Sequence, residues 1–215
     1  KMVTTWPPNF PALGTGATFL ADMISRLSGG RLTVKVYGAG ELVPAFEVFD
    51  AVSAGTAQMG HGSAYYWKGK IPEAQFFSSV PFGLTAQEMS GWLYFGGGME
   101  LWREVYAPYG LLPFDAGNTT VQTAGWFNKE INSVADLKGL KMRVAGPMYI
   151  DVMNALGANP QQMQWGETMT ALQQGVVDGQ ENPIGAVIIP QQVYEVQKYL
   201  TTWHYSYDPI FVGIS

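Results

Sequence analysis

The chain has 215 residues, of which 47% are hydrophobic and only 13% are charged, and its formal net charge at pH 7 is -5. The length allows one domain or two small lobes with a sizeable core. The negative charge without a basic run argues against nucleic acid as a partner, and no apolar run approaches the ~18 residues of a membrane span. The absence of cysteine excludes disulfides, thiol catalysis and cysteine-ligated zinc.

The first quarter of the sequence predicts alternating strands and helices. Residues 2–6 favour a strand, and apolar residues at helical spacing over about 15–28 predict a helix that ends at two glycines. Strict alternation over 31–37 predicts a half-buried edge strand. A second helix over 45–54 and a short strand over 57–61 follow.

Aromatic side chains come directly after this short strand, at Tyr65, Tyr66 and Trp67. Open α/β sheets bind ligands at the carboxyl ends of their strands. Tyr65 and Tyr66 are therefore candidates for the wall of a binding site, and aromatic packing at the surface is the alternative.

The middle of the chain predicts a long helix and two strands. Thr85 with Glu88 three residues later forms a capping-box pattern, and the helix that follows extends to about 106 with an interruption at 96–98. Strands are predicted over 110–115 and 118–128. The second is long and polar for a core strand, which is typical of a strand that leaves one sheet and enters another.

The last third repeats the alternation. A turn precedes a buried strand over 139–146, and the pattern then predicts a helix over 148–156, strands over 161–165 and 176–183 with a helix at 167–174 between them, and a closing strand over 208–215. We therefore predict an α/β fold of two lobes, residues 1–120 and residues 121–207, with 208–215 returning to the first lobe as a hinge strand. A ligand cleft is expected between the lobes.

Arg143 is one of only four arginines and alternates with Leu140, Met142 and Val144 in the buried strand. A guanidinium presents a planar fork of donors that matches a carboxylate with two parallel bonds. Arg143 is therefore a candidate anion receptor, and half of a structural ion pair is the alternative. Catalysis has little support, because His61 and His204 lack metal-ligand spacing and Ser63 lacks the nucleophile-elbow pattern.

Several motifs together resemble the extracytoplasmic solute receptors of TRAP transporters, over essentially the whole chain. They are Thr4–Pro7, Ser28–Leu32, Gly55–Met59, Gly125–Phe127, Asp136–Arg143 and Val177–Pro183. The stretch around Arg143 is the most specific. Residues 39–70 look most like the branch that binds 2-oxo acids such as pyruvate.

The resemblance implies two lobes that close on a small organic acid, in a receptor that is not an enzyme. It implies no catalytic cofactor, a bridging Na⁺ or Ca²⁺, delivery of the acid to the permease subunits in the membrane, and a periplasmic location after removal of a signal peptide. A dimer is left open. By position, the expected substrate residues are Arg143, Gln122, Asn182, Tyr65, Tyr66 and Trp165, and the expected metal ligands are Gln122, Glu181, Asn182 and Asp208.

Asn182 departs from the 2-oxo-acid branch, where a tryptophan follows the acid. The run Gln180–Pro183 looks instead like metal-free receptors for C4-dicarboxylates and sialic acid, so Glu181 and Asp208 are either metal ligands or structural acids. A dicarboxylate predicts a second cationic group, whereas Arg26, Arg31 and Arg103 fall on helix or edge-strand faces. A metal-dependent enzyme using Glu181 is a remote third interpretation. Because the chain stops on a strand, we expect it to be truncated at its C-terminus.

Overall fold

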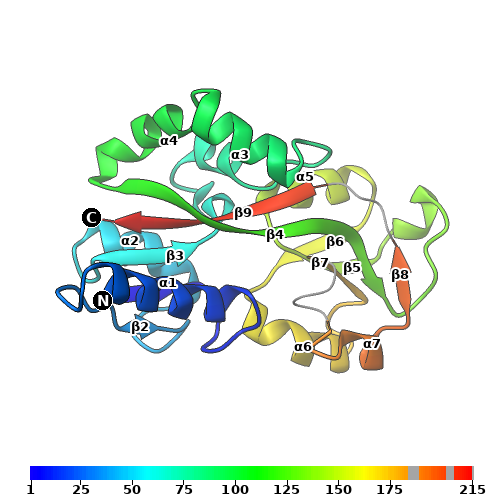
Figure 1. Ribbon diagram of the computed structural model, residues 1–215. Coiled ribbons are helices and arrows are strands. Elements are labelled where there is room, and N and C mark those ends of the chain that lie inside the picture. Colours follow the sequence, from blue (N-terminus) through cyan, green and yellow to red (C-terminus); the bar gives the residue numbers. More distant parts are fainter. Residues whose placement is uncertain (184–188, 202–205, 215) are drawn as a thin grey trace.

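The computed structural model describes residues 1–183, 189–201 and 206–214. It has two α/β lobes joined by two long strands, β4 (Leu112–Phe127) and β9 (Ser206–Ile214), which run side by side through the molecule (Figure 1). The predicted two-lobed fold class is confirmed. The boundary near residue 120 stays a prediction.

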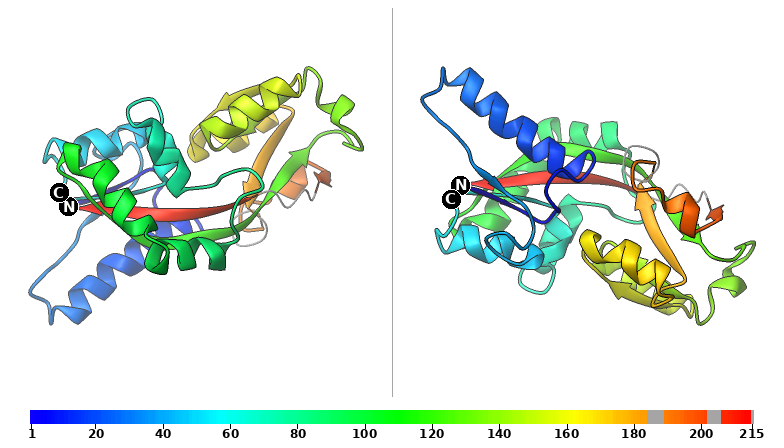
Figure 2. Two further views of the ribbon diagram at one scale, coloured as in Figure 1. Left: turned by 90° about the horizontal axis from the view of Figure 1, so that it is seen from above. Right: turned by 90° about the horizontal axis from the view of Figure 1, so that it is seen from below.

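The first lobe contains three short strands covered by helices on both faces (Figure 2). Its elements are β1 (Met2–Thr4), α1 (Leu13–Leu27), β2 (Val36–Tyr37), η1 (Ala45–Glu47), α2 (Val48–Ser53), β3 (Met59–Gly62), η2 (Ala64–Trp67), η3 (Pro72–Phe77), α3 (Ala86–Phe95), α4 (Gly98–Tyr106) and η4 (Ala107–Tyr109).

The second lobe has the same alternation around the strands β5 to β8. Its elements are η5 (Val134–Leu137), β5 (Lys141–Val144), α5 (Pro147–Ala155), β6 (Asn159–Gln162), α6 (Trp165–Gln173), β7 (Gly179–Pro183), α7 (Val193–Val196) and β8 (Tyr199–Thr201). The sequence predicted Trp165 at the end of a strand, but it is the first residue of α6.

One continuous sheet connects the lobes, in the strand order β2-β1-β3-β9-β4-β7-β5-β6, with β8 beside β4. Strands β1 to β3 are parallel, as are β5 to β7, whereas β4 and β9 pair antiparallel with their neighbours. Parallel strands with helical crossovers are buried on both faces. Their carboxyl ends in the two lobes are the places where a ligand site is expected.

β4 is a single strand of 16 residues where the sequence predicted two. The register shifts between Asp115 and Gly117 and again between Asn118 and Val121, so the strand is irregular at the point where the prediction broke it. Thr120 lies in the left-handed region at φ 65°, and its N–H donates to Asn118 Oδ1 at 2.7 Å. Irregularities of this kind bend a strand and change its twist, so β4 can serve both lobes.

Structural features that depend only on neighbouring residues in the sequence were predicted correctly. Thr85 caps α3, and both halves of its capping box with Glu88 are present. By contrast, the edge strand expected over 31–37 shrinks to Val36–Tyr37, because β1 offers only Met2 and Val3 as pairing partners. The alternation of apolar and polar residues in 31–37 cannot reveal how long the neighbouring strand β1 is.

Each lobe has its own hydrophobic core. The larger core of the first lobe is built around Phe49, Trp67, Phe77, Trp102 and Tyr106. The core of the second lobe surrounds the strand β5. A third cluster holds Trp6, Phe10 and Leu13 of the first lobe together with Trp165 of the second. The lobes are therefore in contact through an aromatic cluster.

His61 is buried at the end of β3, and its Nδ1 accepts a hydrogen bond from Trp6 Nε1 at 2.8 Å. Since Nδ1 is the acceptor, the neutral ring carries its proton on Nε2. Burial lowers the pKa of His61 to about 4. This residue has a structural role, as the sequence indicated.

The titration of His61 predicts a loss of stability in acid. Above pH ~6.5 the ring is neutral in both states, whereas between pH ~6.5 and ~4 the unfolded chain binds a proton that the folded chain does not. The free energy of unfolding should fall by about 3 kcal/mol across this window. Urea unfolding of the wild type and of His61→Asn, measured at pH 7 and pH 4.5, checks this. An equal pH dependence in both proteins would contradict it.

Candidate functional site

Arg143 lies at the centre of the second lobe with none of its side chain exposed. It is the third residue of β5, which sits between β6 and β7, and its neighbours Met142 and Val144 are core residues. Because successive side chains alternate across a strand, Arg143 points away from that apolar core. The sequence placed it correctly in a buried strand.

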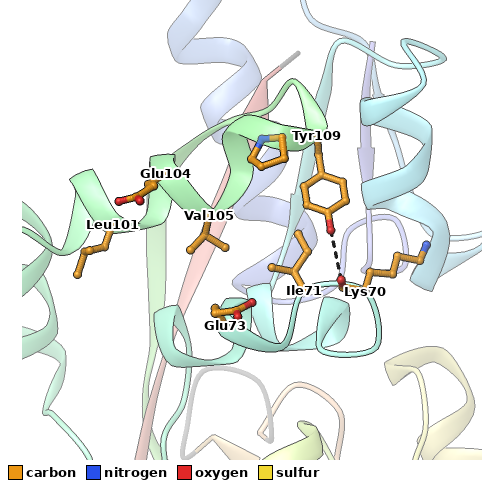
Figure 3. Close-up of a pocket in the computed structure, with 8 residues that line it drawn as sticks. Lys70, Ile71, Glu73, Leu101, Glu104, Val105 and Tyr109 are labelled. Carbon is orange, nitrogen blue, oxygen red and sulfur yellow. Dashed lines mark hydrogen bonds between the residues drawn. The ribbon is translucent and has the colours of Figure 1, made fainter.

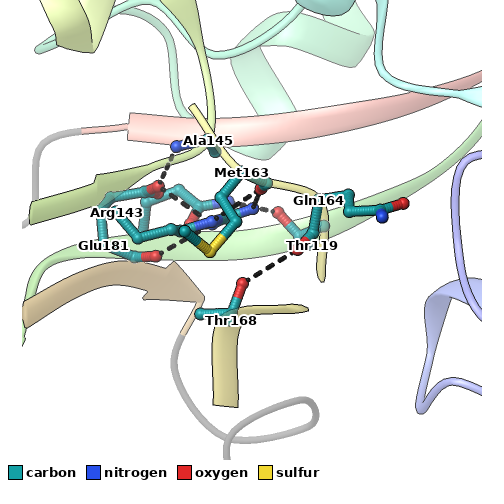
Figure 4. A network of polar contacts seen from close by, with 8 residues as sticks. Thr119, Arg143, Ala145, Met163, Gln164, Thr168 and Glu181 are labelled. Carbon is teal, nitrogen blue, oxygen red and sulfur yellow. Dashed lines mark hydrogen bonds and ion pairs between the residues drawn. The ribbon is translucent and has the colours of Figure 1, made fainter. Parts of the chain in front are cut away.

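Two backbone carbonyls hold the guanidinium (Figure 4). Nε and Nη2 both donate to the carbonyl of Met163 at 3.2 Å, and Nη1 donates to the carbonyl of Glu181 at 3.3 Å. A guanidinium has five N–H groups. These contacts leave one N–H on each terminal nitrogen without a bond to a described residue. That pair matches the two oxygens of a carboxylate.

The indole of Trp165 covers one face of this guanidinium. The Arg143 Cζ lies 4.1 Å from the centre of the indole ring. A cation over an aromatic face gains attraction from the ring quadrupole, and more when it is desolvated. The two carbonyls and the indole of Trp165 together restrict how the guanidinium and its remaining donors are oriented.

Glu181 is also fully buried and lies beside Arg143. Its Oε2 accepts the Ala145 N–H at 3.0 Å and lies 3.9 Å from Arg143 Nη1. The charges of the two side chains therefore offset each other in the interior. Arg143 is thus half of a buried ion pair and still has donors to offer, so the two interpretations left open by the sequence are compatible.

Gln122 lies on β4, which pairs with β7, the strand that carries Glu181. Its side chain is buried, Nε2 donates to Thr119 Oγ1 at 2.8 Å, and Oε1 has no hydrogen-bond partner among the described residues. A buried amide oxygen without a hydrogen bond is costly unless it accepts a bond from a ligand or coordinates a cation. Gln122 is therefore fit to contact a cation or a donor group of a ligand.

The side chains of Asn182 and Asp208 lie outside the described part of the structure. The backbone of Asn182 pairs with Thr123 of β4, and Asp208 lies in β9 between Tyr207 and Pro209. The structure thus brings Arg143 and Glu181 together with Gln122 nearby on the same sheet. The ligand roles of Gln122, Glu181, Asn182 and Asp208 all stay predictions.

The tyrosines of η2 approach from the first lobe. A Cβ added at Gly146, two residues after β5, would lie 3.2 Å from Cγ of Tyr65, so the Tyr65 ring sits against the backbone of the second lobe. Tyr66 packs on Tyr65 with ring centres 4.6 Å apart and on Trp6 at 6.2 Å. Tyr65 is therefore at the contact between the lobes. A role at the substrate stays a prediction.

Further along the same loop, Lys68 forms an ion pair with Asp151 of α5, with 2.7 Å between Nζ and Oδ2. This contact also joins the first lobe to the second. This ion pair lies near the protein surface, because the Lys68 side chain is 30% exposed and that of Asp151 is 68% exposed.

A groove of about 470 Å³ lies elsewhere, on the surface of the first lobe (Figure 3). Its lining residues are Lys70, Ile71, Glu73, Leu101, Glu104, Val105, Pro108 and Tyr109. It shares no residue with the Arg143 site. Its lysine pairs with Asp50, and its other charged residues are acids, so it is poorly suited to an organic anion.

Sequence reasoning missed the backbone groups of the site. The carbonyls of Met163 and Glu181 and the N–H of Ala145 orient Arg143 and its partner. Backbone donors and acceptors are the same in every residue, so no side-chain pattern could have located them.

Two α/β lobes in contact around a buried arginine, with hinge strands between them, define a two-lobed solute-binding protein. The family model "DctP: Bacterial extracellular solute-binding protein, family 7" matches residues 2–215, and the chain belongs to this family. No helix in the described ranges is both long and apolar enough to cross a membrane.

Several relatives are similar over most of the chain. A monocarboxylate 2-oxoacid-binding periplasmic protein of Nostoc sp. is 46% identical over 183 residues, which are 84% of this chain and 49% of that protein. Two crystal structures of TRAP periplasmic solute-binding proteins have TM-scores of 0.93 and cover 99% of this chain and 65% of theirs. One, from Pseudoalteromonas atlantica, is 42% identical and has bound sodium and pyruvate. The other, from Colwellia psychrerythraea, is 41% identical and has bound calcium and pyruvate. The chain thus spans about half the length of the Nostoc relative.

The buried ion pair between Arg143 and Glu181 predicts how substitutions of these two residues change the stability of the protein. Arg143→Met should lower the free energy of unfolding by about 3–5 kcal/mol, because it leaves the Glu181 carboxylate buried without its cation. The double variant Arg143→Met with Glu181→Gln should recover part of this loss, since it leaves no net buried charge. Urea denaturation of the three proteins measures both effects. A double variant less stable than Arg143→Met would contradict the interpretation.

Proposed function

We propose that the chain is the ligand-binding part of a periplasmic TRAP receptor for a small monocarboxylate, either a 2-oxo acid such as pyruvate or a hydroxy acid. The observation that carries this is the pair of remaining N–H donors on the buried Arg143 guanidinium. The receptor would deliver the acid to the permease subunits in the membrane. The relatives described above, two of them with bound pyruvate, support this assignment.

A cation would contribute to binding of this kind. Gln122 Oε1 and the Glu181 carboxylate are hard oxygen donors, which suit Na⁺ or Ca²⁺ and not zinc. The unpartnered, buried Gln122 Oε1 fits a cation ligand. When bound, the cation supplies positive charge for the oxo or hydroxyl oxygen next to the carboxylate. Asn182 and Asp208 are the further proposed ligands.

A metal-free receptor for a C4-dicarboxylate or a sugar acid is the second candidate, favoured by Asn182. A second carboxylate needs a second cationic group at the site. Lys68 is the cation at the contact between the lobes, but Asp151 already neutralises it at 2.7 Å. This ion pair favours a ligand with one carboxylate.

An enzyme is a weaker candidate than a receptor. Glu181 is engaged by the Ala145 N–H and lies beside Arg143, so it is poorly placed to accept a proton.

Calorimetry tests the proposed function. The wild type should bind pyruvate, with weaker binding after the protein is dialysed against EDTA and into sodium-free buffer. Succinate should bind at least tenfold more weakly, because it lacks a second cationic partner. Arg143→Lys keeps the positive charge but loses the planar pair of N–H donors that matches a carboxylate, and should weaken binding at least tenfold. No binding of any small carboxylate would contradict the proposal, and tighter binding of succinate than of pyruvate would favour the second candidate.

The ion pair between Lys68 and Asp151 predicts a salt-dependent effect on the rate at which the ligand dissociates. Lys68→Met should weaken pyruvate binding roughly twofold to fivefold at low salt, through faster dissociation, because exposed ion pairs contribute under ~1 kcal/mol. The effect should shrink at 1 M salt. Lys70→Met is the matched control, since Lys70 pairs with Asp50 inside the first lobe. Equal effects of the two variants in stopped-flow measurements would contradict a role for Lys68 in holding the lobes together.

A further inference from the structure

Phe10 of the first lobe forms an aromatic contact with Trp165. The ring centres are 5.4 Å apart, with 53° between the ring planes. Phe10 and Trp165 are both about 5% exposed and belong to one cluster with Trp6 and Leu13. Trp165 therefore contacts Arg143 of its own lobe and Phe10 of the first lobe.

The loop that carries Phe10 is rigid. Pro7, Pro8 and Pro11 restrict its backbone, and the Phe10 N–H donates to the carbonyl of Pro7 at 3.2 Å. The Phe10 carbonyl accepts N–H groups from Gly14 and Thr15 at the start of α1, which ties the loop to the helix. Phe10 is thus held in place whether or not the second lobe is near.

Trp165 is attached to its own lobe at the start of a helix. It is the first residue of α6, and the preceding residues Met163 and Gln164 connect it to β6. Met163 is also the residue whose carbonyl accepts two N–H groups of Arg143. A shift of the segment from Met163 to Trp165 would therefore change the hydrogen bonds of the guanidinium and also its stacking on the indole.

We infer that Phe10 is a positioning residue for Arg143: when the lobes close, Phe10 presses Trp165 onto the guanidinium and so aligns the two remaining donors with the carboxylate. Phe10 does not touch the ligand in this mechanism. Closure of the lobes and affinity for the acid are thereby coupled through one aromatic contact. The inference rests on the proposed function, because it assumes that Arg143 binds a carboxylate.

A matched pair of substitutions tests this mechanism. Phe77, inside the first lobe, is 4% exposed and faces Trp102 with ring centres 5.3 Å apart, so Phe77→Leu removes a similar aromatic contact away from Arg143. Phe10→Leu should weaken pyruvate binding roughly threefold to tenfold, the range for an aromatic pair. Phe77→Leu should lower stability but change the dissociation constant less than about twofold. If Phe10→Leu does not fold, Phe10→Met replaces it, since methionine fills a similar space.

A double-mutant cycle separates positioning from a merely structural role. In a Trp165→Leu background, Phe10→Leu should have no further effect on pyruvate binding, because its influence passes through Trp165. Additive effects, or an unchanged affinity in Phe10→Leu, would overturn the inference and leave the proposed function intact. A wild type that binds no carboxylate would overturn the proposed function itself.

Discussion

Burial of one positive charge is the constraint on which the rest of this structure depends. A guanidinium without exposure costs several kcal/mol of desolvation unless hydrogen bonds and an opposite charge compensate for it. In this chain two carbonyls, the carboxylate of Glu181 and the face of Trp165 supply the compensation. All of these partners belong to the second lobe, so the charge of the arginine is compensated before any ligand arrives. Such preorganisation is what allows a small acid to be bound by few contacts.

The fold brings these partners together from four separate segments. β5 carries Arg143, the end of β6 leads to Met163 and Trp165, and β7 carries Glu181. β4 places Gln122 beside them and continues into the first lobe, where it pairs with β9. The register of β4 with β9 shifts between Asp115 and Gly117 and between Asn118 and Val121. The strand that carries Gln122 therefore also connects the two lobes.

Sequence reasoning succeeded where the signal was local and failed where a partner decided the outcome. Arg143 stood out because an arginine among Leu140, Met142 and Val144 is unusual, and the capping box at Thr85 is a local pattern. The edge strand at 31–37 was too long because β1 is short, and β4 was divided because its irregular centre looks like a break. The position of Trp165 was predicted on a strand, although its role depends on contacts with Arg143 and Phe10. Contacts between segments far apart in sequence leave no trace in spacing or alternation.

The central claim is that Arg143 binds a carboxylate between the lobes. A crystal structure of the protein with pyruvate tests it most directly. The account predicts that both carboxylate oxygens lie about 3 Å from the two terminal nitrogens of Arg143, the usual distance for charge-assisted bonds. Trp165 should remain stacked on the guanidinium in that complex. Pyruvate density at any other place, with Arg143 bound only to protein groups, would contradict the account.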